Sequence, residues 1–151
     1  MNYLYLGLTD YYLPAAAASL HLKQLNWDAP PSPLKLCELP YFRAVTKADE
    51  GVIRYVGLTE DGEQIYLTTV KKYPEIFVRG IHSLLSIYQV PLSELVIITC
   101  VLENPQVAGW CCFLQRIGWH SAAQQLGTRL VRNRLADLKK LVPHFKTIPC
   151  P

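Results

Sequence analysis

Glycine is scarce in this chain at the points where nucleotide-binding proteins need it. The 151 residues include eight glycines, which form neither Gly-x-Gly-x-x-Gly nor the Gly-x-x-x-x-Gly-Lys-Ser/Thr pattern of a Walker loop. Both motifs use glycine because the backbone must approach a phosphate closely. Their absence excludes the common dinucleotide and P-loop sites.

Long apolar runs and targeting signals are also missing. The longest apolar runs, such as 95–98, are far shorter than the roughly 20 residues that cross a bilayer. The N-terminus lacks the basic start and the apolar stretch of a signal peptide, and we find no internal repeat. We therefore expect one cytoplasmic domain over residues 1–151, with an irregular tail at about 143–151 and no membrane contact.

The five cysteines form no Cys-x-x-Cys pair, and their odd number in a chain without an export signal indicates free thiols. A cysteine phosphatase needs Cys-x5-Arg, but Gln106 follows Cys100 at that spacing, and Arg116 lies one residue too close to Cys111. Cys111 and Cys112 point to different sides of a predicted helix without a His or acid at helical spacing, so we expect no metal site. No Ser/His/Asp order stands out, and we assign no catalytic residue.

Acidic residues are almost absent from the last third of the chain. Residues 104–151 carry seven Lys/Arg and one acid, a net charge of +6, whereas residues 1–103 have a net charge of −3. Arg129 and Arg132 lie on one stripe of the predicted C-terminal helix and could face a protein, an anionic ligand or nucleic acid. A solvated helix face is the more common explanation of such a stripe. No nucleic-acid motif accompanies it, so nucleic acid is the least favoured partner.

The first 25 residues form the segment around which we expect the fold to be organised. The sequence predicts a buried strand at residues 3–6 and a turn at residues 7–13. It also predicts an alanine-rich helix that begins at Pro14 and runs to Leu25. Many phosphate sites begin in this way, because a helix N-terminus offers free N–H groups and a positive dipole end. The N–H groups of residues 13–16, except Pro14, which has none, would then be candidates for phosphate binding.

The remaining elements alternate between strands and helices. Asp61-Gly62 joins two β-rich runs and is typical of an antiparallel hairpin. The predicted elements are hairpin strands 52–58 and 64–70, an amphipathic helix 73–90, a buried strand 94–101, and helices 105–117 and 121–142, the last with Ser121 as N-cap. The order predicts an α/β fold, a single-domain Rossmann-like three-layer sandwich with a mostly parallel sheet and one antiparallel hairpin.

Ligands of such sheets bind beyond the carboxyl ends of the strands. The candidate ligand-binding residues at this edge are Thr9, Asp10, Tyr11, Tyr12 and Asn104. The helix 105–117 has more apolar surface than one face needs, which indicates either a surface for a protein partner or homodimer, or a core helix covered by the last one. The candidate partner-binding residues are Trp110, Trp119, Arg129 and Arg132.

Several segments together resemble one family. They are the opening strand, Leu20-His21-Leu22, Leu39-Pro40-Tyr41-Phe42, the hairpin Gly57 to Gly62 leading to Ile65-Tyr66, and Arg116-Ile117-Gly118. Their joint order resembles the DUF3189 family, an uncharacterised family of small cytosolic α/β proteins from spore-forming bacteria. The resemblance covers nearly the whole chain and implies the same α/β fold.

Members of that family usually carry a Gly-Gly turn followed by His-Ser-Ser before the alanine-rich helix. The corresponding residues 9–14 have neither the glycines nor the His and Ser, although His21 does match. The resemblance therefore implies a divergent member without a catalytic residue to carry over.

We derive three hypotheses for function. The leading one is a non-catalytic binding or interaction protein without a cofactor. The first alternative is an enzyme or binder acting on a small phosphorylated ligand or nucleotide at residues 8–14. The second alternative is nucleic-acid binding through the basic C-terminal helix. A concave polar pocket at the sheet edge would favour a small ligand, whereas a flat or filled surface would favour a protein partner.

Overall fold

The computed structural model describes residues 1–26, 28–100 and 105–142, and the tail predicted at 143–151 lies outside them. Four strands form one sheet in the order β2-β3-β1-β4. They are β1 (Asn2–Leu8), β2 (Arg54–Leu58), β3 (Gln64–Val70) and β4 (Leu95–Cys100). β1 pairs in parallel with β3 and β4, while β2 pairs antiparallel with β3. The mostly parallel sheet with one antiparallel hairpin is thus confirmed.

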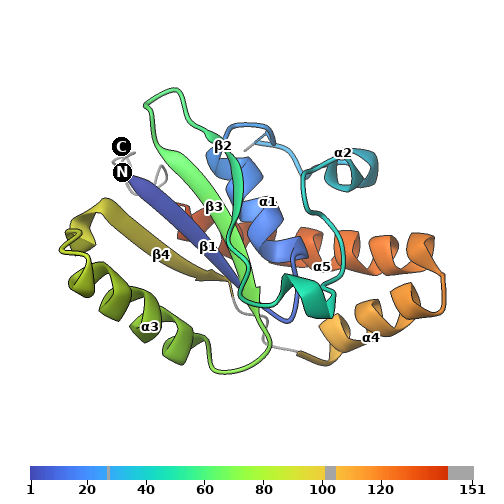
Figure 1. Ribbon diagram of the computed structural model, residues 1–151. Coiled ribbons are helices and arrows are strands. Elements are labelled where there is room, and N and C mark those ends of the chain that lie inside the picture. Colours follow the sequence, from blue (N-terminus) through green and yellow to red (C-terminus); the bar gives the residue numbers. More distant parts are fainter. Residues whose placement is uncertain (27, 101–104, 143–151) are drawn as a thin grey trace.

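The described residues form five α-helices in addition to the sheet (Figure 1). They are α1 (Tyr12–His21), α2 (Pro33–Cys37), α3 (Pro74–Ile87), α4 (Pro105–Arg116) and α5 (His120–Leu141), with short 3-10 turns at η1 (Lys47–Asp49) and η2 (Leu92–Glu94). Figure 1 shows α1 between the sheet and α5, and α3 on the other side of the sheet. The architecture is the Rossmann-like α/β fold that the sequence predicts.

β1 lies in the middle of the sheet and is buried on both faces. Tyr3 and Tyr5 point to α1, where the ring centroids of Tyr3 and His21 lie 4.6 Å apart and the Tyr5 hydroxyl lies 2.8 Å from His21 Nδ1. Leu4 and Leu6 alternate with them, so they point to the opposite face, and they are also buried. Burial on both faces explains why this strand is an uninterrupted apolar run.

α1 is buried along its whole length. It begins at Tyr12, two residues before the predicted start, so Pro14 lies in the first turn, where its missing N–H leaves no hydrogen bond unmade. The helix ends at His21 and not at Leu25, because Lys23 adopts a left-handed conformation with φ 56°. The alanines leave room for the sheet on one side and α5 on the other.

α5 packs closely on α1. Its first helical residue is His120 with Trp119 at the N-cap, so the prediction of Ser121 as N-cap is wrong. Gly127 lies against the Tyr12 ring, and a Cβ at Gly127 would be 2.5 Å from Tyr12 Cδ1 and Cε1. The absence of a side chain at Gly127 therefore sets the distance between the two helices.

Gly127→Ala is expected to destabilise the protein. Helix propensity alone would favour alanine by about 1 kcal/mol, but the clash with Tyr12 should outweigh it and lower the free energy of unfolding by about 1–3 kcal/mol. Urea unfolding measures the change. Gly80 on α3 has open space around its Cβ position, so Gly80→Ala should raise stability. A stabilising Gly127→Ala would contradict the close packing of α5 on α1.

Candidate functional site

A cavity of about 650 Å³ opens at the carboxyl ends of β1 and β3. The sheet contributes Thr9 and residues 69–71 to its lining, the loop before β2 contributes residues 45–47 and Glu50, and α4 contributes one face. We call it the Thr9 cavity. Its position at the carboxyl ends of parallel strands is where open α/β sheets bind their ligands.

The lining of the Thr9 cavity is rich in basic side chains. Lys47, Lys71, Arg116 and His120 all line it, and Glu50 is the single acidic residue among the described residues of the lining. Three threonines, at positions 9, 46 and 69, add hydroxyl groups, and Val45, Val70 and Phe113 add apolar surface. Cationic and hydroxyl groups beside an apolar wall suit a small organic anion.

Asp49 holds the loop that forms one wall of the cavity. Its buried carboxylate accepts two hydrogen bonds from the Arg43 guanidinium, at 2.7 and 2.8 Å, and one from Arg54 at 2.9 Å. It also accepts from the backbone N–H and the hydroxyl of Thr46, at 2.9 and 2.7 Å. The Arg43 hydrogen bonds are the main reason that the pKa of Asp49 lies well below its usual range. This cluster fixes the backbone of the loop on both sides of Lys47.

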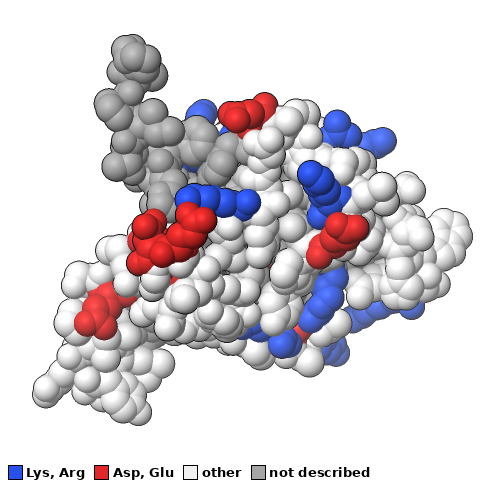
Figure 2. Space-filling model, turned by 90° about the horizontal axis from the view of Figure 1, so that it is seen from above, with Lys and Arg blue, Asp and Glu red and all other residues white. Residues whose placement is uncertain are grey.

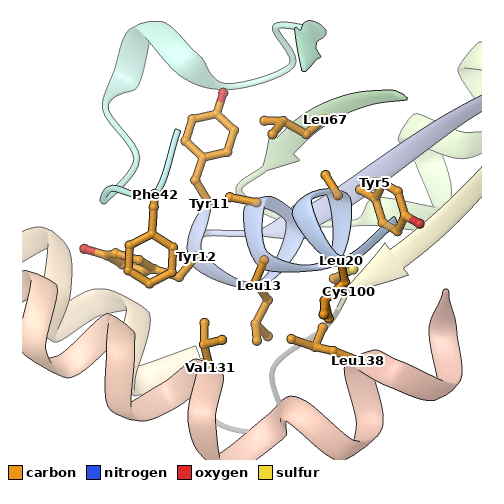
Figure 3. Packing of buried hydrophobic residues seen from close by; sticks show 14 of the residues in the cluster. Tyr5, Tyr11, Tyr12, Leu13, Leu20, Phe42, Leu67, Cys100, Val131 and Leu138 are labelled. Atoms are coloured by element: carbon orange, nitrogen blue, oxygen red, sulfur yellow. The ribbon is translucent and has the colours of Figure 1, made fainter. Parts of the chain in front are cut away.

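Two aromatic rings support the same cluster. The Arg43 guanidinium lies 5.4 Å from the centroid of the Tyr11 ring, and that of Arg54 lies 5.6 Å from the Tyr41 ring. The Tyr11 hydroxyl donates to the Asp49 carbonyl oxygen at 3.3 Å. Figure 3 shows Tyr11 directed to this loop, whereas Tyr12 is directed away from it toward Phe42. Tyr11 thus connects the first turn to the cavity wall.

Of the residues that the sequence singled out for ligand binding, the structure places Thr9 in the cavity lining. Asp10, Tyr11 and Tyr12 are only 1, 0 and 2% exposed, and the ring centroids of Tyr12 and Phe42 lie 4.9 Å apart. A ligand would reach these three side chains only if the turn moved, so their role in binding stays a prediction. Asn104 lies outside the described residues.

The N-terminus of α1 is occupied by the protein's own carboxylate. Asp10 Oδ2 accepts the Leu13 N–H at 2.9 Å, and the Ala15 N–H donates to the Tyr11 carbonyl oxygen at 2.9 Å. These N–H groups are therefore not free for the phosphate that the sequence suggested. The turn is tight as well, because a Cβ at Gly7 would collide with the Asp10 carbonyl oxygen.

The Asp10 carboxyl is in an unfavourable place for a charge. Burial raises its pKa to about 7, although backbone hydrogen bonds from Leu13 and Tyr12 act in the opposite direction. Its Oδ1 atom has no hydrogen-bond partner in the part of the chain that the structure describes. A carboxyl in this position fills the site where an anion would otherwise bind to the helix.

The residues predicted to bind a partner lie on two separate surfaces. Trp110 and Trp119 are 62 and 65% exposed at α4 and just after it, and the Trp110 ring contacts Phe113 edge-to-face. Arg129 and Arg132 line a groove between α2 and α5. That these residues bind a partner stays a prediction.

The described residues give little support for cysteine or metal-ion chemistry. Four cysteines, at positions 37, 100, 111 and 112, are free thiols, and burial raises the pKa of Cys111 to about 11. Cys112 alone among these four lines the Thr9 cavity. Within residues 1–26, 28–100 and 105–142, no three His, Cys, Asp or Glu side chains could jointly hold a metal ion. The same ranges contain no helix that is long and apolar enough to span a bilayer.

His21, the residue that matches the family pattern, lies at the far end of α1 from the turn. It is fully buried between the Tyr5 hydroxyl and the Glu63 carboxylate, whose Oε2 is 3.2 Å from His21 Nε2. It does not line the Thr9 cavity. Its contacts tie α1 to the beginning of β3.

The basic side chains of the cavity had not been predicted as a site. Lys47 and Lys71 are distant in the sequence from each other and from Arg116, which His120 follows by only four residues. The local signal was the spacing of Cys112 and Arg116, which lie four residues apart on one face of α4, whereas His120 begins α5.

Comparison with known proteins places the whole chain in one family. A search of curated proteins and a search of solved structures both give no match. One family model, described as a protein of unknown function (DUF3189), matches residues 2–147. This range includes every strand and helix described above. The chain therefore belongs to the DUF3189 family.

Proposed function

We propose that the protein binds a small anionic molecule, carrying a phosphate or a carboxylate, in the Thr9 cavity. The observation that supports this proposal is the concave lining at the carboxyl edge of the sheet. Its described residues include Lys47, Lys71, Arg116 and His120 and one acidic residue, Glu50. Four basic side chains around one cavity raise the local concentration of anions and favour their binding. The proposal keeps the small ligand of the first alternative but moves it from residues 8–14 to the cavity beside them.

The apolar part of the cavity lining determines which anions we expect to bind most tightly. Val45, Val70 and Phe113 form surface that a bare inorganic anion would not cover. A nucleotide or another phosphorylated metabolite with an apolar or planar body would contact both kinds of surface. We therefore expect such molecules to bind more tightly than phosphate alone.

The proposed role is binding without catalysis. A base within hydrogen-bond reach is one way to activate a cysteine nucleophile, but the Cys112 thiol donates to the Val45 carbonyl oxygen at 3.7 Å. Among the described residues, no hydrogen bond joins Cys112 to His120. The described lining has the groups to hold an anion, and its one thiol, that of Cys112, is not paired with a base.

A thermal-shift screen of phosphate, nucleotides and phosphorylated metabolites tests the proposal. A ligand present at a hundred times its dissociation constant adds about 2.7 kcal/mol to the free energy of unfolding. For the best ligand, Lys71→Gln and Arg116→Gln should each weaken binding by about tenfold or more, which corresponds to about 1.4 kcal/mol. Isothermal titration calorimetry measures the change.

Lys72→Gln is the matched control, since Lys72 is exposed and does not line the cavity. It should leave the affinity unchanged. Equal losses in Lys72→Gln and Lys71→Gln would mean that the ligand responds to overall charge and not to this cavity. A panel without any stabilising anion would contradict the proposal directly.

A further inference from the structure

A second concave surface lies between α2 and α5, with a volume of about 710 Å³. Its walls are the proline-rich segment 30–37 and one face of α5, residues 121–133. We call it the α2–α5 groove. It shares no lining residue with the Thr9 cavity, so a ligand in one does not use the groups of the other.

The groove carries positive charge without a counter-charge. Arg129 and Arg132 are three positions apart on α5, which places them on neighbouring turns of the same face. Both are exposed, and neither forms an ion pair or a hydrogen bond within the described part of the chain. The described lining contains no Asp or Glu. By contrast, Arg134 on the same helix pairs with Asp137 at 3.2 Å.

The distribution of charged residues over the surface agrees with the positive charge of the α2–α5 groove. Figure 2 views the molecule from above, with left and right as in Figure 1. On the face that it shows, most Lys and Arg lie over the side that holds α2, α4 and α5, whereas the side that holds α3 shows acidic and uncharged residues. An acidic partner would therefore approach the α2–α5 side first.

The two walls of the groove differ in chemistry. On the α5 side, Gln125 and Asn133 present amide groups that can donate to and accept from a peptide backbone. On the α2 side, Pro30, Pro33 and Leu34 form an apolar lip, and Leu34 is 77% exposed. An extended chain in the groove would meet hydrogen-bonding groups on one side and apolar surface on the other.

The groove is held in shape by local structure. The Ser32 hydroxyl accepts the Lys35 N–H at 3.3 Å and caps α2. The prolines fix the backbone that leads into the helix. At the floor, Cys37 Sγ lies 4.0 Å from Thr128 Oγ1, and Thr128 is buried. A groove with a fixed backbone loses less entropy when a partner binds.

We propose that the α2–α5 groove binds an extended acidic segment of a partner protein. Glutamate or aspartate side chains of the segment pair with Arg129 and Arg132, and an aliphatic side chain packs on Leu34 and the prolines. Arginine suits this role because its planar guanidinium binds a carboxylate through two parallel hydrogen bonds. Nucleic acid fits less well, because single strands bind through stacking on aromatic rings, and no aromatic residue belongs to the described lining.

Fluorescence anisotropy with a labelled peptide of alternating glutamate and leucine tests the inference. We expect saturable binding to the full chain, at least tenfold weaker binding to the double variant Arg129→Glu, Arg132→Glu, and a smaller loss for Leu34→Ala. The matched control is Arg79→Glu, Lys140→Glu, which changes the net charge equally at exposed positions outside the groove. This control should retain affinity. Circular dichroism verifies that each variant is folded.

Each other outcome overturns the inference. No saturable binding of the acidic peptide would do so, and so would equal losses in the two double variants, because overall charge would then explain the binding. Tighter binding of a single-stranded oligonucleotide than of the peptide, lost in Arg129→Glu, Arg132→Glu, would assign the groove to nucleic acid. Anion binding in the Thr9 cavity should be unaffected by the groove variant, so the two proposals can fail separately.

Discussion

Asp10→Asn is expected to flatten the dependence of stability on pH. Burial raises the pKa of Asp10 to about 7 in the folded protein, from 3.8 for the exposed group. Between these two values the folded state binds a proton that the unfolded state has released. The stabilisation is therefore fully present below about pH 4 and is lost as the pH rises through about 7. Asparagine cannot ionise, so the variant lacks this loss.

The size of the loss of stability follows from the shift in the pKa of Asp10. Each pKa unit corresponds to about 1.4 kcal/mol, so the wild-type protein should lose roughly 2–3 kcal/mol relative to Asp10→Asn between about pH 5 and pH 8. Below about pH 4, where the carboxyl is protonated in both the folded and the unfolded state, the variant should be no more stable than the wild type. The amide preserves an oxygen for the Leu13 N–H, while its nitrogen takes the place of the unpartnered Oδ1.

Urea unfolding at a series of pH values measures this prediction. The exposed Asp61→Asn provides the control for the loss of one negative charge. If the stability curves of wild type and Asp10→Asn ran parallel from pH 5 to 8, the buried carboxyl would not be the group that titrates. The carboxyl would then be charged and solvated, and the first turn would be more open than the structure shows.

Asp49→Asn is expected to have the second large effect. It removes a buried charge that faces Arg43 and Arg54 and leaves two guanidiniums without their carboxylate. Breaking a buried pair costs about 3–5 kcal/mol. We expect a loss near the lower end, about 3 kcal/mol, because both arginines are about one-third exposed and water replaces part of the interaction.

The loss should also depend on pH, with the opposite sign to that of Asp10. The pKa of Asp49 is lowered in the folded state, so its contribution is present above about pH 4 and is lost as the pH falls below that. The difference between wild type and Asp49→Asn should accordingly shrink in acid. Chemical unfolding near pH 7 and near pH 3 measures both values.

The substitution Asp49→Asn should also weaken anion binding in the Thr9 cavity. Thr46 and Lys47 line the cavity and belong to the loop that Asp49 holds, so anion affinity should fall in Asp49→Asn. Glu60→Gln is the matched control, because its pair with Lys23 is exposed on both sides. It should change neither stability nor affinity measurably. An Asp49→Asn protein as stable as Glu60→Gln would contradict the proposed role of Asp49.

The sequence alone determined the secondary structure and its order, because those signals are local. The Asp61-Gly62 turn predicted the hairpin, and Gly62 does adopt a left-handed conformation with φ 80°. The apolar periodicity of α3 and the continuous apolar run of β4 set the type of each element. Alternation of strands and helices then favoured a mostly parallel sheet. Boundaries were less accurate, as at α1 and α5, since Pro14 and Ser121 fit more than one position at a helix start.

Only the tertiary structure decided which polar groups face a ligand. Asp10, Tyr11 and Tyr12 follow a strand at the correct edge, yet all three are buried. Tyr11 packs on the Asp49 loop and Tyr12 on Phe42 and Gly127, which are remote in sequence. The Thr9 cavity joins segments near residues 9, 46, 70 and 116 for the same reason. Periodicity reports the neighbours of a residue along one element, whereas burial and convergence depend on how separate elements pack. The sequence thus determined the scaffold, and packing between distant segments decided where an anion can bind.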